Sequence, residues 1–158
     1  MKEKLHIRKA KIEDFEDIHK LMIQVHQLHV TERNDIYKDT EPIDKNELQE
    51  ELSKEETKYL VAEWENRIVG ICFSKIKEIS HHKMMKDRKI LHIETICVDK
   101  KYKRQGIGTK LYKEISKIAI ENKVDSIELM VWGFNEEAIH FYEKLGMQIK
   151  NLKFEKNV

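Results

Sequence analysis

Two glycines, Gly106 and Gly108, stand two residues apart inside the basic segment 103–109. The apolar run 90–98 precedes this segment, and an apolar pattern with helical spacing begins inside it. Glycine allows a tight turn and a close approach of the backbone to a ligand, and the start of a helix leaves N–H groups without partners. Together with the basic side chains, these features predict a phosphate-binding turn between a buried strand and a helix.

Two familiar phosphate-binding motifs do not fit this turn. A P-loop requires Gly-Lys-Ser/Thr after a first glycine and four further residues, whereas Gly108 is followed by Thr109 and Lys110, and Lys103 stands where the first glycine belongs. The dinucleotide-binding fingerprint requires a third glycine, at the position that Leu111 occupies. On these residues alone, an ordinary strand–helix turn without a ligand is the alternative.

A second motif favours a ligand-binding turn over an ordinary strand–helix turn. It combines an Asn, an Ala, a Phe-Tyr pair and a Gly in fixed spacing: Asn135, Ala138, Phe141, Tyr142 and Gly146. With the stretch 93–108, in this order and separation, it resembles the GNAT family of acetyl-CoA-dependent N-acetyltransferases. The family's loop reads Gln/Arg-x-x-Gly-x-Gly/Ala, and Lys103 at its first position keeps the charge but lacks the planar fork of arginine. The close resemblance covers about residues 90–150.

The resemblance implies acetyl-CoA as co-substrate, with no metal and no acyl-enzyme. It implies that two neighbouring strands splay apart after Val98 and Val131, that pantetheine pairs with the backbone near Ile96 and Val98, and that pyrophosphate meets the N–H groups of 105–109. The residues expected to contact the cofactor are Ile96, Cys97, Val98, Lys103, Arg104, Gln105, Gly106, Ile107, Gly108, Thr109, Asn135 and Tyr142.

Direct transfer of an acetyl group to an amine needs a base for the amine, a positioned thioester and an acid near the departing sulfur. Tyr142 matches the family's general acid, a phenol close to the thioester sulfur, and a core aromatic on an amphipathic helix is the alternative. Asn135 matches the family's cofactor-facing Asn. It is also a candidate helix N-cap, and the two roles can coexist.

Glu94 is the first candidate for the base, and His92 is the residue that could act in its place. Glu94 stands among apolar residues, where an unpaired carboxylate is costly to bury, and the ordinary pKa of histidine suits the same task. Strict alternation places His92, Glu94, Ile96 and Val98 on one face of the strand and Cys97, interpreted as a core residue, on the other. The alternatives are an exposed Glu94 paired with a lysine and a half-buried His92 without a catalytic role.

Composition excludes several classes of protein. The chain has 158 residues, enough for one domain with a sizeable core, so a single domain over 1–158 is expected. Its 30 basic and 29 acidic residues leave a net charge of +1, without the basic excess of a nucleic-acid binder. Cys72 and Cys97 lie in apolar runs, as expected for the reduced thiols of a cytoplasmic protein. No stretch has the length and apolarity of a membrane span, and no secretory signal is visible.

The remaining pattern predicts an α/β protein with a mixed sheet and helices on both faces. A capping box at Asp44 and Glu47 begins one helix, Glu65-Asn66 is a hairpin turn, and Gly146 ends the last helix. Strands are expected at 5–8, 59–64, 67–77, 91–98, 126–132 and 148–154, and helices at 12–30, 44–53, from 107, and at 135–145.

The sequence therefore predicts an acetyl-CoA-dependent N-acetyltransferase that acts on the primary amine of a small molecule or peptide by direct attack. A GNAT-like module that binds CoA as a sensor or partner subunit, without turnover, is the alternative. Transfer of a longer acyl group is also open. The expected partners are the amine acceptor and, from the resemblance, a second copy in a homodimer, with no nucleic acid and no membrane.

Overall fold

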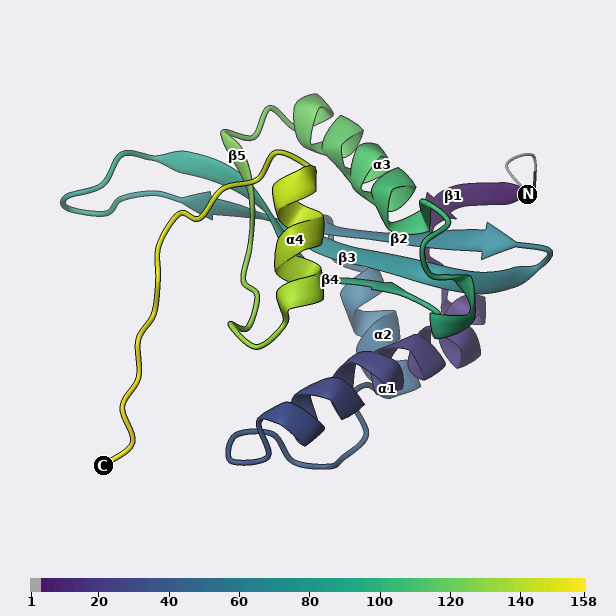
Figure 1. Cartoon of the computed structure of the whole chain (residues 1–158). Coiled ribbons are helices and arrows are strands. Elements are labelled where there is room, and N and C mark those ends of the chain that lie inside the picture. Colours follow the sequence, from purple (N-terminus) through teal and green to yellow (C-terminus); the bar gives the residue numbers. More distant parts are fainter. Residues whose placement is uncertain (1–3) are drawn as a thin grey trace.

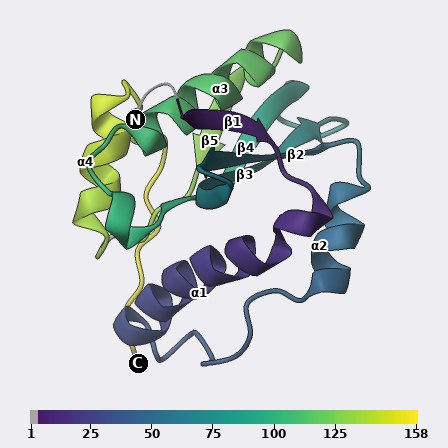
Figure 2. The same cartoon turned by 90° about the vertical axis from the view of Figure 1, so that its right-hand side faces the viewer.

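An open five-stranded sheet forms the middle layer of the computed structural model, which describes residues 4–158. Helices α1 and α2 cover one face of the sheet, and α3 and α4 cover the other (Figures 1 and 2). This mixed sheet with helices on both faces confirms the predicted fold class. The elements are β1 (Leu5–Lys9), α1 (Phe15–Glu32), α2 (Lys45–Leu52), β2 (Thr57–Trp64), β3 (Arg67–Ile79), β4 (Arg88–Val98), α3 (Ile107–Glu121), β5 (Ser126–Leu129) and α4 (Glu136–Lys144).

The strands follow one another across the sheet in chain order, β1-β2-β3-β4-β5. Neighbouring strands are antiparallel except β4 and β5, which are parallel. A parallel pair needs a crossover, and α3 provides it. The predicted hairpin turn between β2 and β3 is confirmed: Glu65 and Asn66 both have positive φ angles, 50° and 64°, as a two-residue turn between twisted strands requires.

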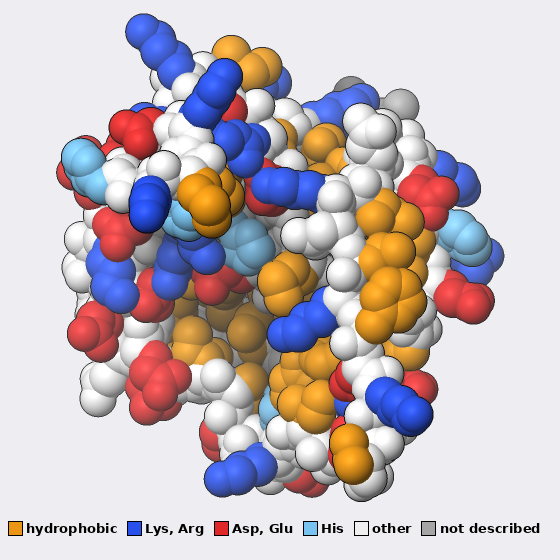
Figure 3. All heavy atoms as spheres, turned by 90° about the vertical axis from the view of Figure 1, so that its left-hand side faces the viewer, with side chains coloured by type: hydrophobic (Ala, Val, Ile, Leu, Met, Phe, Trp, Pro, Cys, Tyr) orange, Lys and Arg blue, Asp and Glu red, His pale blue; other side chains and the backbone are white. Residues whose placement is uncertain are grey.

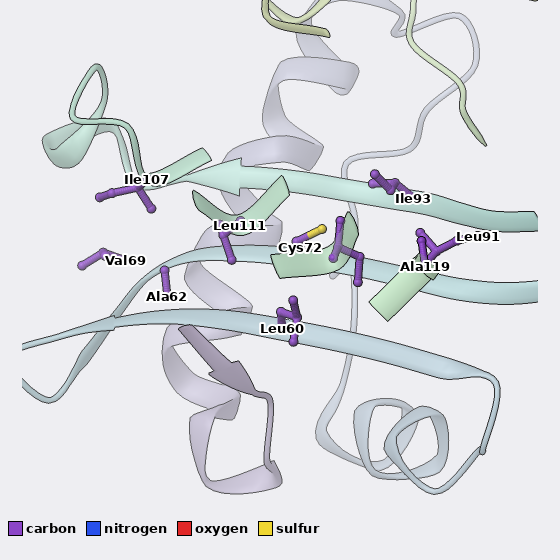
Figure 4. Packing of buried hydrophobic residues seen from close by; sticks show 10 residues of the cluster. Leu60, Ala62, Val69, Cys72, Leu91, Ile93, Ile107, Leu111 and Ala119 are labelled. Carbon is purple, nitrogen blue, oxygen red and sulfur yellow. The ribbon is translucent and has the colours of Figure 1, made fainter. Parts of the chain in front are cut away.

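The predicted apolar stripe of α3 faces the sheet. Leu111 and Ile115 are fully buried against residues of β2, β3 and β4. Figure 4 shows the side chains of α3 and of the strands pointing toward one another in this layer. No helix within residues 4–158 combines the length and apolar character needed to cross a bilayer.

The start of α1 is fixed to the sheet by a partly buried ion pair. Arg8 of β1 donates two hydrogen bonds of 2.8 Å to the two carboxylate oxygens of Asp14, and the Lys11 N–H donates to the same carboxylate at 2.9 Å. Burial opposes the charge on Asp14, but the bonds from Arg8 and the backbone outweigh it and hold the pKa of the carboxyl below its ordinary value. The capping box that begins α2 is confirmed, with the Glu47 N–H donating to Asp44 at 2.8 Å.

The predicted last strand at 148–154 is wrong. Within the described chain these residues form no regular element; they leave α4 after Gly146 and run in extended form alongside the sheet edge (Figure 1). The strand before them, β5, ends at Leu129 rather than at Trp132. Apolar spacing indicates that a segment can form a strand, but a strand also needs a neighbour with unpaired backbone groups, and local sequence does not specify that neighbour.

Candidate active site

A gap opens between β4 and β5, the last two strands of the sheet. Their pairing runs only from Ile90 and Ser126 to Ile93 and Leu129, so the splay starts earlier than the predicted positions. The cause is a β-bulge in β4: on β3, consecutive residues pair with Thr95 and Ile93, and Glu94 has no partner there. A bulge bends the strand that carries the extra residue, and here it coincides with the point where β4 leaves β5.

The bulge reverses the direction of the backbone groups of β4. At its start, the Lys89 carbonyl points to β5 and accepts a bond of 2.7 Å from the Asp125 N–H. Just past its end, the Asp99 N–H points to β3 and donates to the Val69 carbonyl at 2.8 Å. Backbone groups alternate along a strand, so these two odd-numbered residues would point the same way in a regular strand. The extra residue turns the even-numbered backbone groups of the second half toward the gap.

The backbone N–H and C=O groups of Ile96 and Val98 therefore face the gap. Gln24 of α1 donates to the Val98 carbonyl at 2.9 Å and accepts from the Lys100 N–H at 3.2 Å. This side chain fixes the end of β4 against α1. The Ile96 groups and the Val98 N–H stay directed into the gap, where the resemblance implied that pantetheine pairs with the strand.

The bulge also changes which side chains share a face, so the alternation assumed from the sequence is wrong. Ile96 and Val98 pack with the core under α3. His92 pairs across the sheet with Lys75, whose ammonium contacts α2, so His92 lies on the opposite face. Cys97 is buried in the core under α1, on the same face as His92.

Glu94 is more exposed than the sequence predicted. Its side chain keeps 38% of its surface accessible, accepts a hydrogen bond of 3.2 Å from the Tyr59 hydroxyl and lies 3.8 Å from the Lys75 ammonium. Lys75 also lies 2.7 Å from Glu51 of α2. This is the geometry of the alternative, a lysine-paired acid, and the role of Glu94 as base stays a prediction.

His92 is half-buried beside the bulge. Burial lowers the pKa of its imidazole below the ordinary histidine value, and the nearby Lys77 lowers it further, while Glu94 and Glu128 oppose the shift. The ring is therefore neutral at pH 7 and can accept a proton.

The loop before α3 has the shape expected of an anion site. Arg104 and Gly106 both have left-handed backbone, with φ angles of 64° and 78°, and alternating backbone conformations of this kind form concave N–H cradles. In the described chain, α3 starts at Ile107 without a side-chain cap and without an acidic residue in its first turn. A Cβ built on Gly106 would meet no described atom within 4 Å, so the loop is open on that side. Lys103 ties the loop to α4 through Glu137 at 3.6 Å.

Gly108 lies where α3, α4 and β4 meet. A Cβ built on it would lie 3.2 Å from the Phe141 ring and 3.8 Å from the Val98 side chain. The sequence suggested that this glycine serves close approach to a ligand; the structure adds that it lets the two helices pack closely.

Tyr142 of α4 stands on the α3 side of the sheet, near the Cys72 thiol. Burial, with a smaller contribution from Cys72, raises the pKa of its phenol to about 12. The phenol is therefore protonated at neutral pH, as a general acid must be. Asn135 is the N-cap of the same helix, since its side chain accepts from the Ala138 N–H at 3.2 Å. A contact of Asn135 with the cofactor stays a prediction.

A cluster of aromatic side chains that the sequence did not predict connects α1 and the loop after it with the segment after β5. The Trp132 indole donates to the Tyr37 hydroxyl at 2.9 Å, the ring of His29 stacks on Tyr37, and the Arg33 guanidinium lies 4.9 Å from the Trp132 ring. Burial, and then the nearby His26, lower the pKa of His29. On the side of the molecule next to β5, the surface is hollowed, with hydrophobic side chains inside the hollow and charged ones around it (Figure 3).

Comparison with known proteins agrees with this geometry. The model of the Acetyltransferase (GNAT) family matches residues 22–147. Thialysine N-epsilon-acetyltransferase of Mus musculus is 34% identical over 37% of this chain and 34% of its own length, and L-ornithine N5-acetyltransferase of Arabidopsis thaliana is 36% identical over 37% and 25%. The matches thus span about a third or less of these relatives. A mutant of the BH1408 protein from Bacillus halodurans superposes with a TM-score of 0.94 at 32% identity, over 97% of this chain and 99% of that one.

Proposed function

Because the chain belongs to the GNAT acetyltransferase family, we propose that it is an acetyl-CoA-dependent N-acetyltransferase that modifies a primary amine by direct attack. One observation carries the proposal: the gap between β4 and β5, into which the bulge turns the backbone of Ile96 and Val98. The anion-binding loop and Tyr142 belong to elements that flank the same strand.

The residues around the gap fit acetyl-CoA. The Ile96 groups and the Val98 N–H would pair with the amides of pantetheine, as an added strand pairs with a sheet. The N–H groups of 105–109 would meet the pyrophosphate, with Lys103 and Arg104 adding positive charge. The bound co-substrate supplies an activated acetyl group and a thiolate leaving group.

Two side chains have the protonation state that the transfer requires, a protonated Tyr142 and a neutral His92. Tyr142 keeps its phenol proton at neutral pH and gives it to the departing sulfur. His92, which is neutral at neutral pH, accepts the proton of the acceptor ammonium, and Glu94 beside it attracts that cation. Glu94 as the base itself is the alternative.

Direct attack is favoured over an acyl-enzyme because the chain offers a poor nucleophile at this place. Cys97 is the cysteine of β4 beside the gap, and burial raises the pKa of its thiol to about 12. The thiolate, not the thiol, attacks a thioester, so at neutral pH Cys97 is inert. The acceptor amine itself therefore attacks the acetyl group.

We propose a small aliphatic amine as the acceptor. Glu94 lies on the face of the sheet that carries His92 and keeps 38% of its side-chain surface accessible, and an accessible carboxylate favours a cationic amine. The two curated relatives named above are acetyltransferases of the side-chain amines of thialysine and ornithine. A peptide amine is the alternative acceptor, and the cytoplasm stays the predicted location.

A thiol-release assay with acetyl-CoA and a panel of amines tests the proposal. Lysine, thialysine, ornithine and peptides with free α-amines are compared, and the product mass identifies the acetylated amine. Gly108→Glu is the control: it places bulk against Phe141 and a negative charge at the anion site, so we expect acetyl-CoA binding to be lost in calorimetry. CoA binding without thiol release for any amine would support the sensor alternative, and faster release from a longer acyl-CoA would correct the donor.

A further inference from the structure

The carboxylate of Glu94 has one oxygen fixed and the other open. Its Oε1 atom accepts the hydrogen bond of 3.2 Å from the Tyr59 hydroxyl. The Tyr59 ring stacks on the ring of Phe73 with the centroids 3.9 Å apart, and both residues are buried, so this hydroxyl has a fixed position. Within residues 4–158, no hydrogen bond or ion pair reaches the Oε2 atom of Glu94. This second oxygen is therefore available to the ammonium of an acceptor.

A cation of the chain itself lies beside Glu94. The Lys75 ammonium is 3.8 Å from the Oε1 atom of Glu94, which is beyond hydrogen-bond distance. The same ammonium is 2.7 Å from the Oε2 atom of Glu51 on α2, the helix that covers this face of the sheet together with α1 (Figure 2). In the part of the chain that the structure describes, Lys75 forms ion pairs with these two acids and with no other.

Glu51 binds the Lys75 ammonium more closely than Glu94 does. The Oε2 atom of Glu51 is buried beside this ammonium, and its Oε1 atom lies 2.8 Å from the Lys54 ammonium. Lys54 and then Lys75 lower the pKa of the Glu51 carboxyl, and burial opposes them only in part, so Glu51 is ionised at neutral pH. A buried carboxylate oxygen without a cation is costly. This favours the short contact of Lys75 with Glu51 over the long one with Glu94.

We propose that Glu51 is a positioning residue for the acceptor: it holds the Lys75 ammonium away from Glu94 and so keeps Glu94 free to pair with a cationic amine. Lys75 moved closer to Glu94 would occupy that carboxylate and repel the incoming ammonium. Lys75 thus determines how strongly the site attracts a cation, and Glu51 determines the position of Lys75. The inference rests on the proposed function, because it concerns the acceptor site of the same reaction.

The test is the KM of the acceptor, measured with the amine of the panel that the wild-type chain acetylates fastest. Glu51→Gln removes the charge that holds Lys75 and keeps the shape of the side chain. We expect it to raise this KM by roughly 5-fold, the upper value for an exposed ion pair. Lys75→Met removes the competing cation and should lower this KM by a similar factor. In the double variant E51Q/K75M the KM should equal that of Lys75→Met, because Glu51 acts through Lys75.

The opposite signs of the two single variants are the distinguishing result. Both variants break the same ion pair, so a purely structural role predicts that KM changes in the same direction in both. In every variant, kcat at saturating amine and the KM of acetyl-CoA should be unchanged. Lys54→Met is the matched control, because it removes the other cation beside Glu51 and leaves Lys75 in place; its KM should be that of the wild type.

Melting curves verify that each variant is folded. If Glu51→Gln alone is unstable, the lowered KM of Lys75→Met and of the double variant still decides the question. KM changes of the same sign in both single variants would overturn the proposal, and so would a wild-type KM in Lys75→Met. A double variant whose KM reflects the sum of the two single effects would also overturn it, because Glu51 would then act without Lys75.

Calorimetry separates this inference from the proposed function. It measures the affinity of the amine for the CoA-bound chain without turnover, with ornithine as the probe if no amine is acetylated. The expected order of affinities without thiol release would refute the proposed function and retain the role of Glu51. Acetylation with KM values that do not follow this order would refute the role of Glu51 and retain the function. A chain that neither acetylates nor binds an amine would refute both.

Discussion

Replacing Tyr142 with phenylalanine separates catalysis from packing. Within the described residues, Tyr142 is half-buried and its hydroxyl is not among the buried polar atoms that lack a partner, so its removal leaves no buried group unsatisfied and should change the free energy of unfolding by less than about 0.5 kcal/mol. The melting temperature should then move by less than about 2 °C. A general acid contributes roughly 10²–10⁴-fold to the rate, which corresponds to about 2.7–5.5 kcal/mol of barrier. We therefore expect kcat to fall by that factor while the affinity for CoA is unchanged.

The pH dependence provides a second check on the same substitution. With a phenol pKa of about 12, only roughly one wild-type molecule in 10⁴ has lost this proton at pH 8. Deprotonation of the Tyr142 phenol should therefore not limit the wild-type rate at neutral or mildly alkaline pH. Thiol release under saturating acetyl-CoA and amine measures kcat, and calorimetry measures CoA affinity. A Tyr142→Phe enzyme with wild-type kcat on a good acceptor would refute the assignment and return Tyr142 to a packing role.

Three further predictions concern charge. Because burial lowers the pKa of His92, kcat/KM should rise with pH below the ordinary histidine value, and His92→Ala should remove that rise. Glu94→Gln should raise KM for the amine and leave the pH profile of kcat/KM unchanged. If Glu94→Gln removes the rise with pH and His92→Ala leaves it, Glu94 is the base. Asp14→Asn should destabilise the fold by about 1.5–3 kcal/mol at pH 7, since Arg8 loses one of the two ion-pair partners that it has among residues 4–158, Asp14 and Glu63. The folded-state pKa of Asp14 is lowered, so the stability that its carboxylate contributes is present above the ordinary aspartate pKa and is lost as pH falls through the folded-state pKa. Urea unfolding measures this: the difference in the free energy of unfolding between the wild-type and Asp14→Asn chains should be smaller in acid than at pH 7.

Local signals predicted the elements of the fold well. The capping box at Asp44, the Glu65-Asn66 turn and the apolar stripe of α3 each depend on residues within a few positions of one another, and each is confirmed. The family model that matches residues 22–147 confirms the resemblance. The resemblance could be recognised from the sequence because its two motifs occupy short, contiguous blocks.

Contacts between distant segments could not be predicted from the sequence. Tyr37 and Trp132 are separated by 95 positions, and nothing in either neighbourhood indicates the other. The strand expected at 148–154 failed for a related reason: Leu152 and Phe154 have the pattern of a strand, but pairing depends on an edge elsewhere. The single extra residue at Glu94 is equally invisible, because a bulge is recognised only against the partner strand.

The bulge at Glu94 affects both the backbone groups that face the gap and the position of the candidate base. A regular β4 would turn the Val98 backbone toward β3 and present the backbone groups of Cys97 on the gap side instead. The same regular strand would place the side chain of Cys97 under α3, in the core that Cys72 occupies. With the extra residue at Glu94, the backbone groups of Ile96 and Val98 face the gap, while the side chains of His92 and Glu94 stay on the face of the sheet that α1 and α2 cover. Under the proposed function, this displacement of one residue decides which backbone groups of β4 meet the acetyl donor, and it keeps the candidate base beside them.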